Sequence, residues 1–162
     1  MDLNLLIQSL VFNLSHLGIF LSTFLISSFI PVPSEAVLVA AGVMGFTPLD
    51  MVIYGGLGSA FGAVVAYYIG RYGGRPFLNK YGKYFLINPS RLKFYDRWFK
   101  KWGNYTILIG RIIPIVPHKI LSVSAGVADV NLKYFFIFTL IGSLPRIFIL
   151  SYFGSYLKGF LL

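Results

Sequence analysis

Residues 30–43 read IPVPSEAVLVAAGV and residues 114–127 read PIVPHKILSVSAGV, with the same order of prolines, small residues and apolar residues. A gapless shift of 84 residues aligns the two stretches, and further identities continue along the chain after them. The aligned pairs include Pro33 with Pro117 and Gly42 with Gly126. Apolar composition alone does not produce aligned prolines and glycines. The sequence therefore predicts two copies of one structural unit.

Prolines divide each copy into two short apolar arms. In the first copy an arm of about 13 residues follows Gly18 and ends at Pro31 and Pro33, and a second arm covers residues 36–45. A helix of ~13 residues is ~20 Å long, whereas the hydrocarbon core of a bilayer is ~30 Å thick. Each copy therefore predicts a re-entrant helical hairpin, with a single kinked spanning helix as the alternative. The corresponding prolines of the second copy are Pro114 and Pro117.

A longer apolar run follows each predicted hairpin, at about residues 48–70 and 131–158, and each run can cross a bilayer as one helix. A hairpin plus one crossing reverses the direction of the chain, so the second copy is expected to be inverted, as in transporters built from inverted repeats. We expect an all-α integral membrane protein of a single domain, residues 1–162. Its parts are repeat 1 at about 18–74, a basic amphipathic linker at about 75–102 and repeat 2 at about 103–158. Residues 3–13 are expected to form an interfacial or partly inserted helix.

The composition excludes most soluble and catalytic classes. Of the 162 residues, 57% are hydrophobic and 12% are charged, whereas soluble domains have about 25% charged residues. There is no cysteine, and the chain has two histidines and five acids. Acid–base and metal chemistry need several convergent titratable groups. We therefore expect a membrane protein that is not an enzyme and that has no cofactor or metal site.

Positive charge is concentrated in one segment. Nine of the fourteen Lys and Arg residues lie within residues 71–101, where Asp96 is the only acid. Leu92, Tyr95 and Phe99 recur at helical spacing opposite the basic residues, which predicts an amphipathic helix in the headgroup region with its cations toward anionic lipid. The positive-inside rule places this segment in the cytoplasm. The same residue types can bind nucleic acid, but a chain this apolar favours the membrane.

The candidate site lies at the proline breaks. Glu35 and Lys119 occupy equivalent positions of the two copies, and an ionisable group at membrane depth is a functional candidate by default. Arg111 lies in an apolar arm and needs an anionic partner, which is Glu35, a lipid phosphate or each in turn. The alternative is a purely structural Glu35 that Lys119 or Arg111 neutralises. Arg146, beside Pro145, is a further candidate and is either a ligand or a structural group. His118 is another, either a proton relay or a plain hydrogen-bonding group.

These motifs resemble those of the DedA/VTT superfamily, also called SNARE-associated Golgi proteins. The resemblance rests on IPVPSEAVLVAAG, on YYIGRYGG, on GRIIPIVPHKILSVSAG and on IGSLPR, and it covers about residues 18–158. It implies two opposed re-entrant hairpins and movement of lipids between leaflets, including phospholipids and polyprenyl phosphate. By motif position it assigns roles to Glu35, Arg111 and Arg71. The remaining motif positions are Pro31, Pro33, Gly42, Pro114, Pro117 and Gly126.

The chain also departs from the family pattern. Ile26 and Ser27 stand where many bacterial members have a second acid, Ala63 stands where an Asp is frequent, and residues 115–117 read IVP in place of Gly-Val-Arg. These losses argue against proton coupling in particular.

We therefore expect a translocase or scramblase that moves a phosphate-bearing lipid through a polar cleft between the hairpins. The substrate-binding candidates are Glu35, Arg111, Lys119, His118 and Arg146. The alternatives are a proton- or ion-coupled transporter of a small solute and a membrane scaffold. The expected partners are anionic or polyprenyl phosphate lipids and a second copy in a homodimer, not nucleic acid, and the expected location is a prokaryotic cell membrane.

Overall fold

A computed structural model describes residues 3–28, 34–81, 89–113 and 116–161, and the regular structure within these ranges is helical. The described elements are α1 (Leu3–Ser28), α2 (Ser34–Met44), α3 (Pro48–Asp50), the π-helix η1 (Met51–Gly55), α4 (Gly56–Tyr81), α5 (Pro89–Trp102), α6 (Tyr105–Ile112), α7 (His118–Val127) and α8 (Leu132–Leu161). This confirms the all-α prediction.

Within the described ranges, two helices are long and apolar enough to cross a membrane. They cover Pro48–Pro76 and Leu132–Phe160, close to the two runs that the sequence predicts. The first begins sharply because Thr47 and Asp50 form a capping box and Pro48 occupies the first turn. This helix changes direction at Gly74. The φ angle of Gly74 is 60°, which residues other than glycine rarely adopt. The change of direction falls where the predicted basic linker begins.

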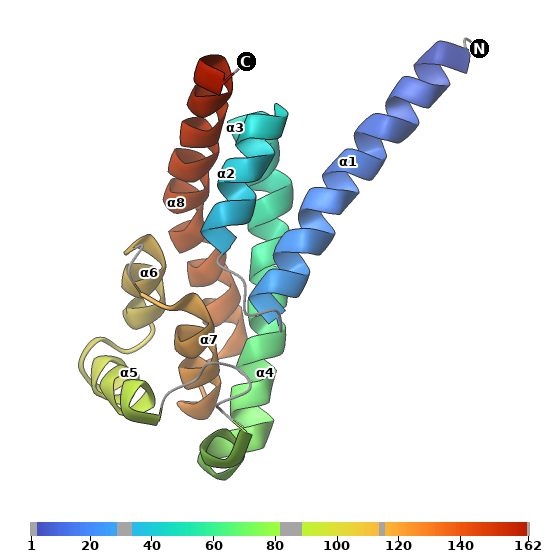
Figure 1. The fold of residues 1–162 in the computed structure, drawn as a ribbon. Helices are drawn as coiled ribbons and strands as arrows, with labels where there is room; N and C mark the ends of the chain where they lie inside the picture. The colour runs from blue at the N-terminus through green and yellow to red at the C-terminus, as the bar shows by residue number, and fades with distance from the viewer. Residues whose placement is uncertain (1–2, 29–33, 82–88, 114–115, 162) are drawn as a thin grey trace.

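Helices end and begin on either side of each proline break. α1 ends at Ser28 and α2 begins at Ser34, while α6 ends at Ile112 and α7 begins at His118. Pro31, Pro33 and Pro114 lie outside the described residues. Pro117 directly precedes α7 with extended backbone angles, as expected for a residue that has no amide donor. Figure 1 shows that α2 and α7 begin near the middle of the molecule and run in opposite directions.

Residues 3–13, expected to form an interfacial or partly inserted helix, are helical, but they are continuous with the arm that follows Gly18. α1 is continuous from Leu3 to Ser28 and passes through Gly18, so it is about 39 Å long rather than a ~20 Å arm. Glycine costs only about 1 kcal/mol in a helix interior, and α1 contains no proline. The helix therefore continues, and its N-terminal half extends away from the other helices (Figure 1).

The short helices α2 and α7 each pack against the long helix of the other copy. In α2, a Cβ on Gly42 would meet backbone atoms of Gly154 in α8, and in α7 a Cβ on Gly126 would meet the backbone of Tyr67 in α4. Gly70 of α4 is also in backbone contact with α7. Gly42 and Gly126 are repeat-equivalent, as are Gly70 and Gly154. The same close contact is therefore made twice, with the two copies exchanging roles.

The turns from the short helices into the long ones also match. The backbone hydrogen bonds are Gly45 N–H to Gly42 O (3.1 Å), Phe46 N–H to Ala41 O (3.2 Å), Asp129 N–H to Gly126 O (3.1 Å) and Val130 N–H to Ala125 O (3.1 Å). The two pairs of bonds lie 84 residues apart. Gly45 and Asp129 both have positive φ, at 99° and 53°. The two copies thus share local structure as well as sequence.

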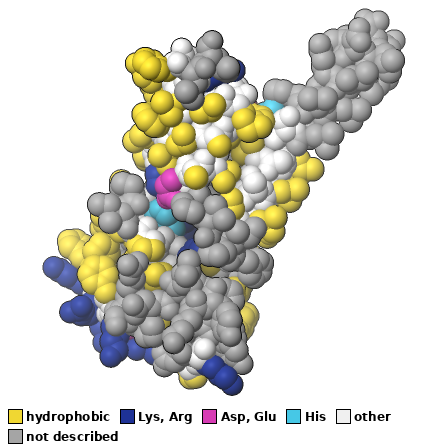
Figure 2. Space-filling view, viewed as in Figure 1, with side chains coloured by type: hydrophobic (Ala, Val, Ile, Leu, Met, Phe, Trp, Pro, Cys, Tyr) yellow, Lys and Arg dark blue, Asp and Glu magenta, His cyan; other side chains and the backbone are white. Residues whose placement is uncertain are grey.

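The basic helix α5 has a different neighbour from the one expected. Leu92, Tyr95 and Phe99 are buried in the protein core, in a cluster that includes Ile107 and Leu121. Its apolar face is thus covered by α6 and α7, not by lipid, because these helices present an apolar surface of their own. The exposed side chains of α5 include Lys93, Phe94, Arg97, Lys100, Lys101 and Trp102, and Figure 2 shows basic side chains gathered at this end of the molecule.

Candidate functional site

Glu35 and Arg146 form an ion pair across the molecule. Glu35 lies in the first turn of α2, and its Oε1 accepts a hydrogen bond from Nη1 of Arg146, which lies in the middle of α8. The Glu35 side chain is 40% exposed, whereas that of Arg146 is 6% exposed. The predicted neutralisation of Glu35 by Arg111 or Lys119 is corrected to Arg146, since α2 packs against α8. The carboxylate is the accessible half of the pair.

Arg111 lies at the end of α6 and is 2% exposed. Its Nη2 donates a hydrogen bond of 2.7 Å to Oγ of Ser122 in α7, and Ser122 in turn donates to the His118 carbonyl at 2.9 Å. Gly142 of α8 faces the Arg111 Cβ at a distance that leaves no room for a side chain. Helices α7 and α8 therefore fix the position of the guanidinium with a neutral partner. Among the described residues no carboxylate forms an ion pair with it.

His118 begins α7 beside these arginines. Both of its ring nitrogens are buried without a hydrogen-bond partner in the described part of the chain, as is Nε of Arg111. The charges of Arg111 and Arg146 act on His118, and the two guanidinium groups repel each other. Lys119 is the next residue and is half-buried. The structure therefore brings Glu35, Arg146, Arg111 and His118 together, with Lys119 adjacent in the chain.

The site has more positive than negative charge. It contains two guanidinium groups, Arg111 and Arg146, and one carboxylate, Glu35, which pairs with Arg146. The helices α2 and α7, of 11 and 10 residues, both begin near the middle of the molecule and add the positive ends of their dipoles (Figure 1). Figure 2 shows acidic, histidine and basic side chains adjoining one another midway along this face. Such an arrangement is chemically suited to an anion, because a planar guanidinium fork matches two oxygens of a phosphate.

Arg71 lies elsewhere. It is near the far end of α4, where it donates to the Tyr67 hydroxyl at 3.1 Å and pairs with Asp129 at 3.0 Å. Tyr67 in turn donates to the Val130 carbonyl at 2.5 Å. These contacts fasten α4 to the turn between α7 and α8, so in this structure Arg71 supports the packing. Gly42 and Gly126 do the same through close helix contacts.

Sequence reasoning misses the residues that position Arg111. Ser122 is an ordinary helical serine in the sequence, and only the fold shows that it accepts from Arg111. Gly142 could have been found from the sequence, because it aligns with Gly58 of the first copy. No group of three or more His, Asp or Glu residues in the described ranges is close enough to hold a metal ion.

Comparison with known proteins agrees with the motifs. The VTT domain family model matches residues 30–156. Similar proteins from Bacillus subtilis are the membrane protein YkoX (40% identical over 88% of this chain and 64% of the relative), undecaprenyl phosphate transporter A (38%, over 76% and 64%) and the membrane protein YbfM (33%, over 85% and 87%). The chain thus spans just under two thirds of the first two relatives. No solved structure matches.

The family match begins after α1 and runs from α2 through most of α8, so it includes every residue of the site above. It confirms the resemblance to the DedA/VTT superfamily and agrees with the two helices that can cross a membrane. The chain is a membrane protein that belongs to the VTT domain family.

Proposed function

We propose that this protein moves a phosphate-bearing lipid between the two leaflets of a bacterial membrane, with polyprenyl phosphate as the leading substrate. Two relatives support this substrate class by name. Undecaprenyl phosphate transporter A of Bacillus subtilis is 38% identical, and its namesake in Staphylococcus aureus is 32% identical over 120 residues. Phospholipids share the same headgroup chemistry and are the second substrate class.

The burial of Arg111 is the observation that carries the proposal. A guanidinium at membrane depth costs several kcal/mol unless it is paired or hydrated. Arg111 is held by the neutral Ser122, close to the second guanidinium of Arg146. An anion between the two arginines would compensate both charges. Because each guanidinium presents parallel N–H groups, a phosphate fits better than a monovalent ion.

Glu35 gives the site a way to release its substrate. The carboxylate is partly exposed and holds Arg146 in the absence of substrate. An entering phosphate displaces Glu35 and bridges Arg146 and Arg111, with Lys119 and His118 at the side. When Glu35 returns to Arg146, the phosphate is released. Without this competitor, two buried arginines would trap the anion.

The architecture supplies a route. We propose that α1–α2 and α6–α7 are opposed hairpins of an inverted repeat, each entering the membrane from a different side. The opposite directions of α2 and α7 and the exchanged glycine contacts support this arrangement. The headgroup would cross in the polar region between the hairpins while the acyl or prenyl tails stay in lipid. We also propose that the protein forms a homodimer and that its basic segment lies in the cytoplasm.

Reconstitution tests the proposal directly. The full chain is placed in liposomes that contain a fluorescent phospholipid or a fluorescent polyprenyl phosphate, and dithionite is added outside. We expect only the outer leaflet to be quenched without protein and both leaflets with it. Arg111→Ala removes a charge-assisted contact of about 1.5–3 kcal/mol, so the rate should fall roughly 10- to 100-fold.

The matched control is Lys133→Ala, which removes an exposed basic residue of α8 and should leave the rate unchanged. Equal quenching with and without protein, for every lipid, would exclude lipid translocation. Proton flux without lipid movement would favour the small-solute transporter. If Arg111→Ala and Lys133→Ala were equally active, the binding role of Arg111 would be wrong.

A further inference from the structure

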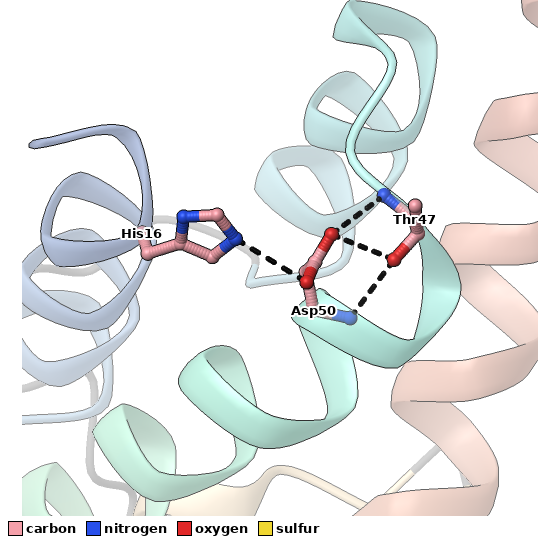
Figure 3. Close-up of polar contacts among 3 residues, drawn as sticks. All are labelled: His16, Thr47 and Asp50. Atoms are coloured by element: carbon pink, nitrogen blue, oxygen red, sulfur yellow. Dashed lines mark hydrogen bonds and ion pairs between the residues drawn. The ribbon is translucent and has the colours of Figure 1, made fainter. Parts of the chain in front are cut away.

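The two histidines of the chain have different surroundings. His16 of α1 lies against an acid: its Nε2 is 3.2 Å from Oδ1 of Asp50, whose Oδ2 closes the capping box with Thr47 (Figure 3). Asp50 follows the C-terminal end of α2, whereas Glu35 lies at the N-terminal end of that helix. His16 thus has a carboxylate partner outside the candidate site, and His118 is the histidine within the site.

His118 has no such partner among the described residues. Both of its ring nitrogens are buried, and neither makes a hydrogen bond within the part of the chain that the structure describes. A buried polar atom without a partner costs free energy, and nearly all such atoms in native proteins are paired with protein, water or a ligand. A ligand that offers a hydrogen bond to this ring would therefore be favoured over one that does not.

His118 is tied to Arg111 through the first turn of α7. Ser122 donates from Oγ to the His118 carbonyl oxygen at 2.9 Å, and the same Oγ accepts from Nη2 of Arg111 at 2.7 Å. Ser122 thereby holds the guanidinium against the turn that His118 begins. The charges of both Arg111 and Arg146 act on the imidazole. An anion that bridges the two guanidinium groups therefore lies beside the imidazole.

Phosphate esters differ in the oxygens that they offer to such a site. A monoester has three terminal oxygens, whereas a diester has two. Guanidinium groups only donate, and they hold two terminal oxygens of either ester equally well. The third oxygen of a monoester carries a proton or a negative charge, and a neutral imidazole suits both forms because it has one donor and one acceptor nitrogen. In a diester this oxygen is blocked by a second alcohol.

We propose that His118 selects a phosphate monoester over a phosphate diester, by a hydrogen bond to the third terminal oxygen. This inference rests on the proposed function, and it ranks polyprenyl phosphate, a monoester, above diester phospholipids such as phosphatidylglycerol. The neighbouring Lys119 is a point charge on a flexible stem and attracts both esters. Arg111 and Arg146 hold the oxygens that both esters share. His118 is thus the specificity-determining residue, and the arginines supply affinity.

A matched pair of lipids tests this selection. Geranylgeranyl phosphate and its methyl ester have the same prenyl chain and differ in whether the third oxygen is free. Isothermal titration of the full chain in detergent micelles measures the affinity for each lipid. We expect the unmodified protein to bind the monoester roughly 10-fold or more tightly than the methyl ester. Equal affinities for the two lipids would overturn the proposal, and this result needs no variant.

Variants separate the imidazole from the second negative charge that a monoester carries. His118→Leu keeps a side chain of similar size without polar atoms, so monoester affinity should fall roughly 10- to 100-fold, while affinity for the methyl ester should stay within about twofold. His118→Asn and His118→Gln each place an amide near one of the two ring nitrogens, and at least one of them should keep the preference. Unchanged selectivity in His118→Leu, or an equal loss for both lipids, would overturn the proposal.

The matched control is His16→Leu, which removes the other buried histidine and should leave the selectivity unchanged. Thermal unfolding in detergent shows whether each variant is folded. If liposomes show no lipid movement while the selectivity still depends on His118, lipid transport is rejected and the role of His118 is supported. If lipids move but His118→Leu keeps the selectivity, transport stands and the role of His118 is wrong. Failure of the full chain to bind either lipid would reject both.

Discussion

The Glu35–Arg146 pair combines a partly exposed acid with a buried base, and this asymmetry sets its energetics. Removing one partner of a fully buried pair costs about 3–5 kcal/mol, because a charge is left without compensation. Water screens the 40% exposed Glu35, so a smaller cost applies here. The functional role and the stabilising role of Glu35 are therefore separable by measurement.

We predict that Glu35→Gln lowers stability by about 1–3 kcal/mol, because Arg146 is left buried and charged. Thermal unfolding in detergent should show a fall in Tm. The matched control is Asp96→Asn, which breaks the more exposed pair with Arg75 and should change stability by less than about 1 kcal/mol. Equal Tm values for Glu35→Gln and the unmodified chain would mean that the pair carries no folding energy.

In transport, Glu35→Gln should have a different signature from Arg111→Ala. Without the competing carboxylate, we expect tighter binding of a phosphate lipid and slower release, because both arginines then hold the anion. Lipid binding and the translocation rate, measured on the same reconstituted protein, separate the two effects. If Glu35→Gln bound the lipid more weakly, Glu35 would be a ligand rather than a competitor.

At the level of helices, small residues set how closely the elements approach. A Cβ on Gly126 would meet the backbone of Tyr67 and Arg71, whereas a Cβ on Gly18 meets nothing within 4 Å. We predict that Gly126→Ala forces α7 and α4 apart and costs about 1–3 kcal/mol. Gly18→Ala should instead stabilise α1 by about 0.5–1 kcal/mol. Thermal unfolding should show a lower Tm for Gly126→Ala and a higher Tm for Gly18→Ala. An unchanged Tm for Gly126→Ala would contradict the close contact between α7 and α4.

The helix α5 shows where element prediction stops. Its amphipathic pattern predicts a helix within the basic segment, and α5 covers Pro89–Trp102. The pattern does not say what covers the apolar face. Lipid and an apolar protein surface offer Tyr95 and Phe99 the same burial free energy per unit area. Only the packed position of α6 and α7 assigns this face to the protein core.

At the scale of the whole molecule, the basic segment and α3 lie at opposite ends (Figure 1). If the basic segment is cytoplasmic, Leu49 faces the outside. We predict that a membrane-impermeant maleimide labels Leu49→Cys but not Lys101→Cys in intact cells, and labels both after permeabilisation. Both positions are exposed, so burial does not explain a difference. The reverse pattern would invert the topology and the entry sides of the two hairpins.

The sequence by itself determined the helical membrane fold, the two long helices, the proline breaks and the repeat, because periodicity, length and proline chemistry are local properties. It also determined which side chains are chemically unusual at membrane depth: Glu35, Arg111 and Arg146. Only the tertiary structure decided their pairing. Glu35 meets Arg146 and Arg111 meets Ser122 because α2 packs against α8 and α6 packs against α7. Such contacts depend on helix crossing and register, which a linear pattern does not encode.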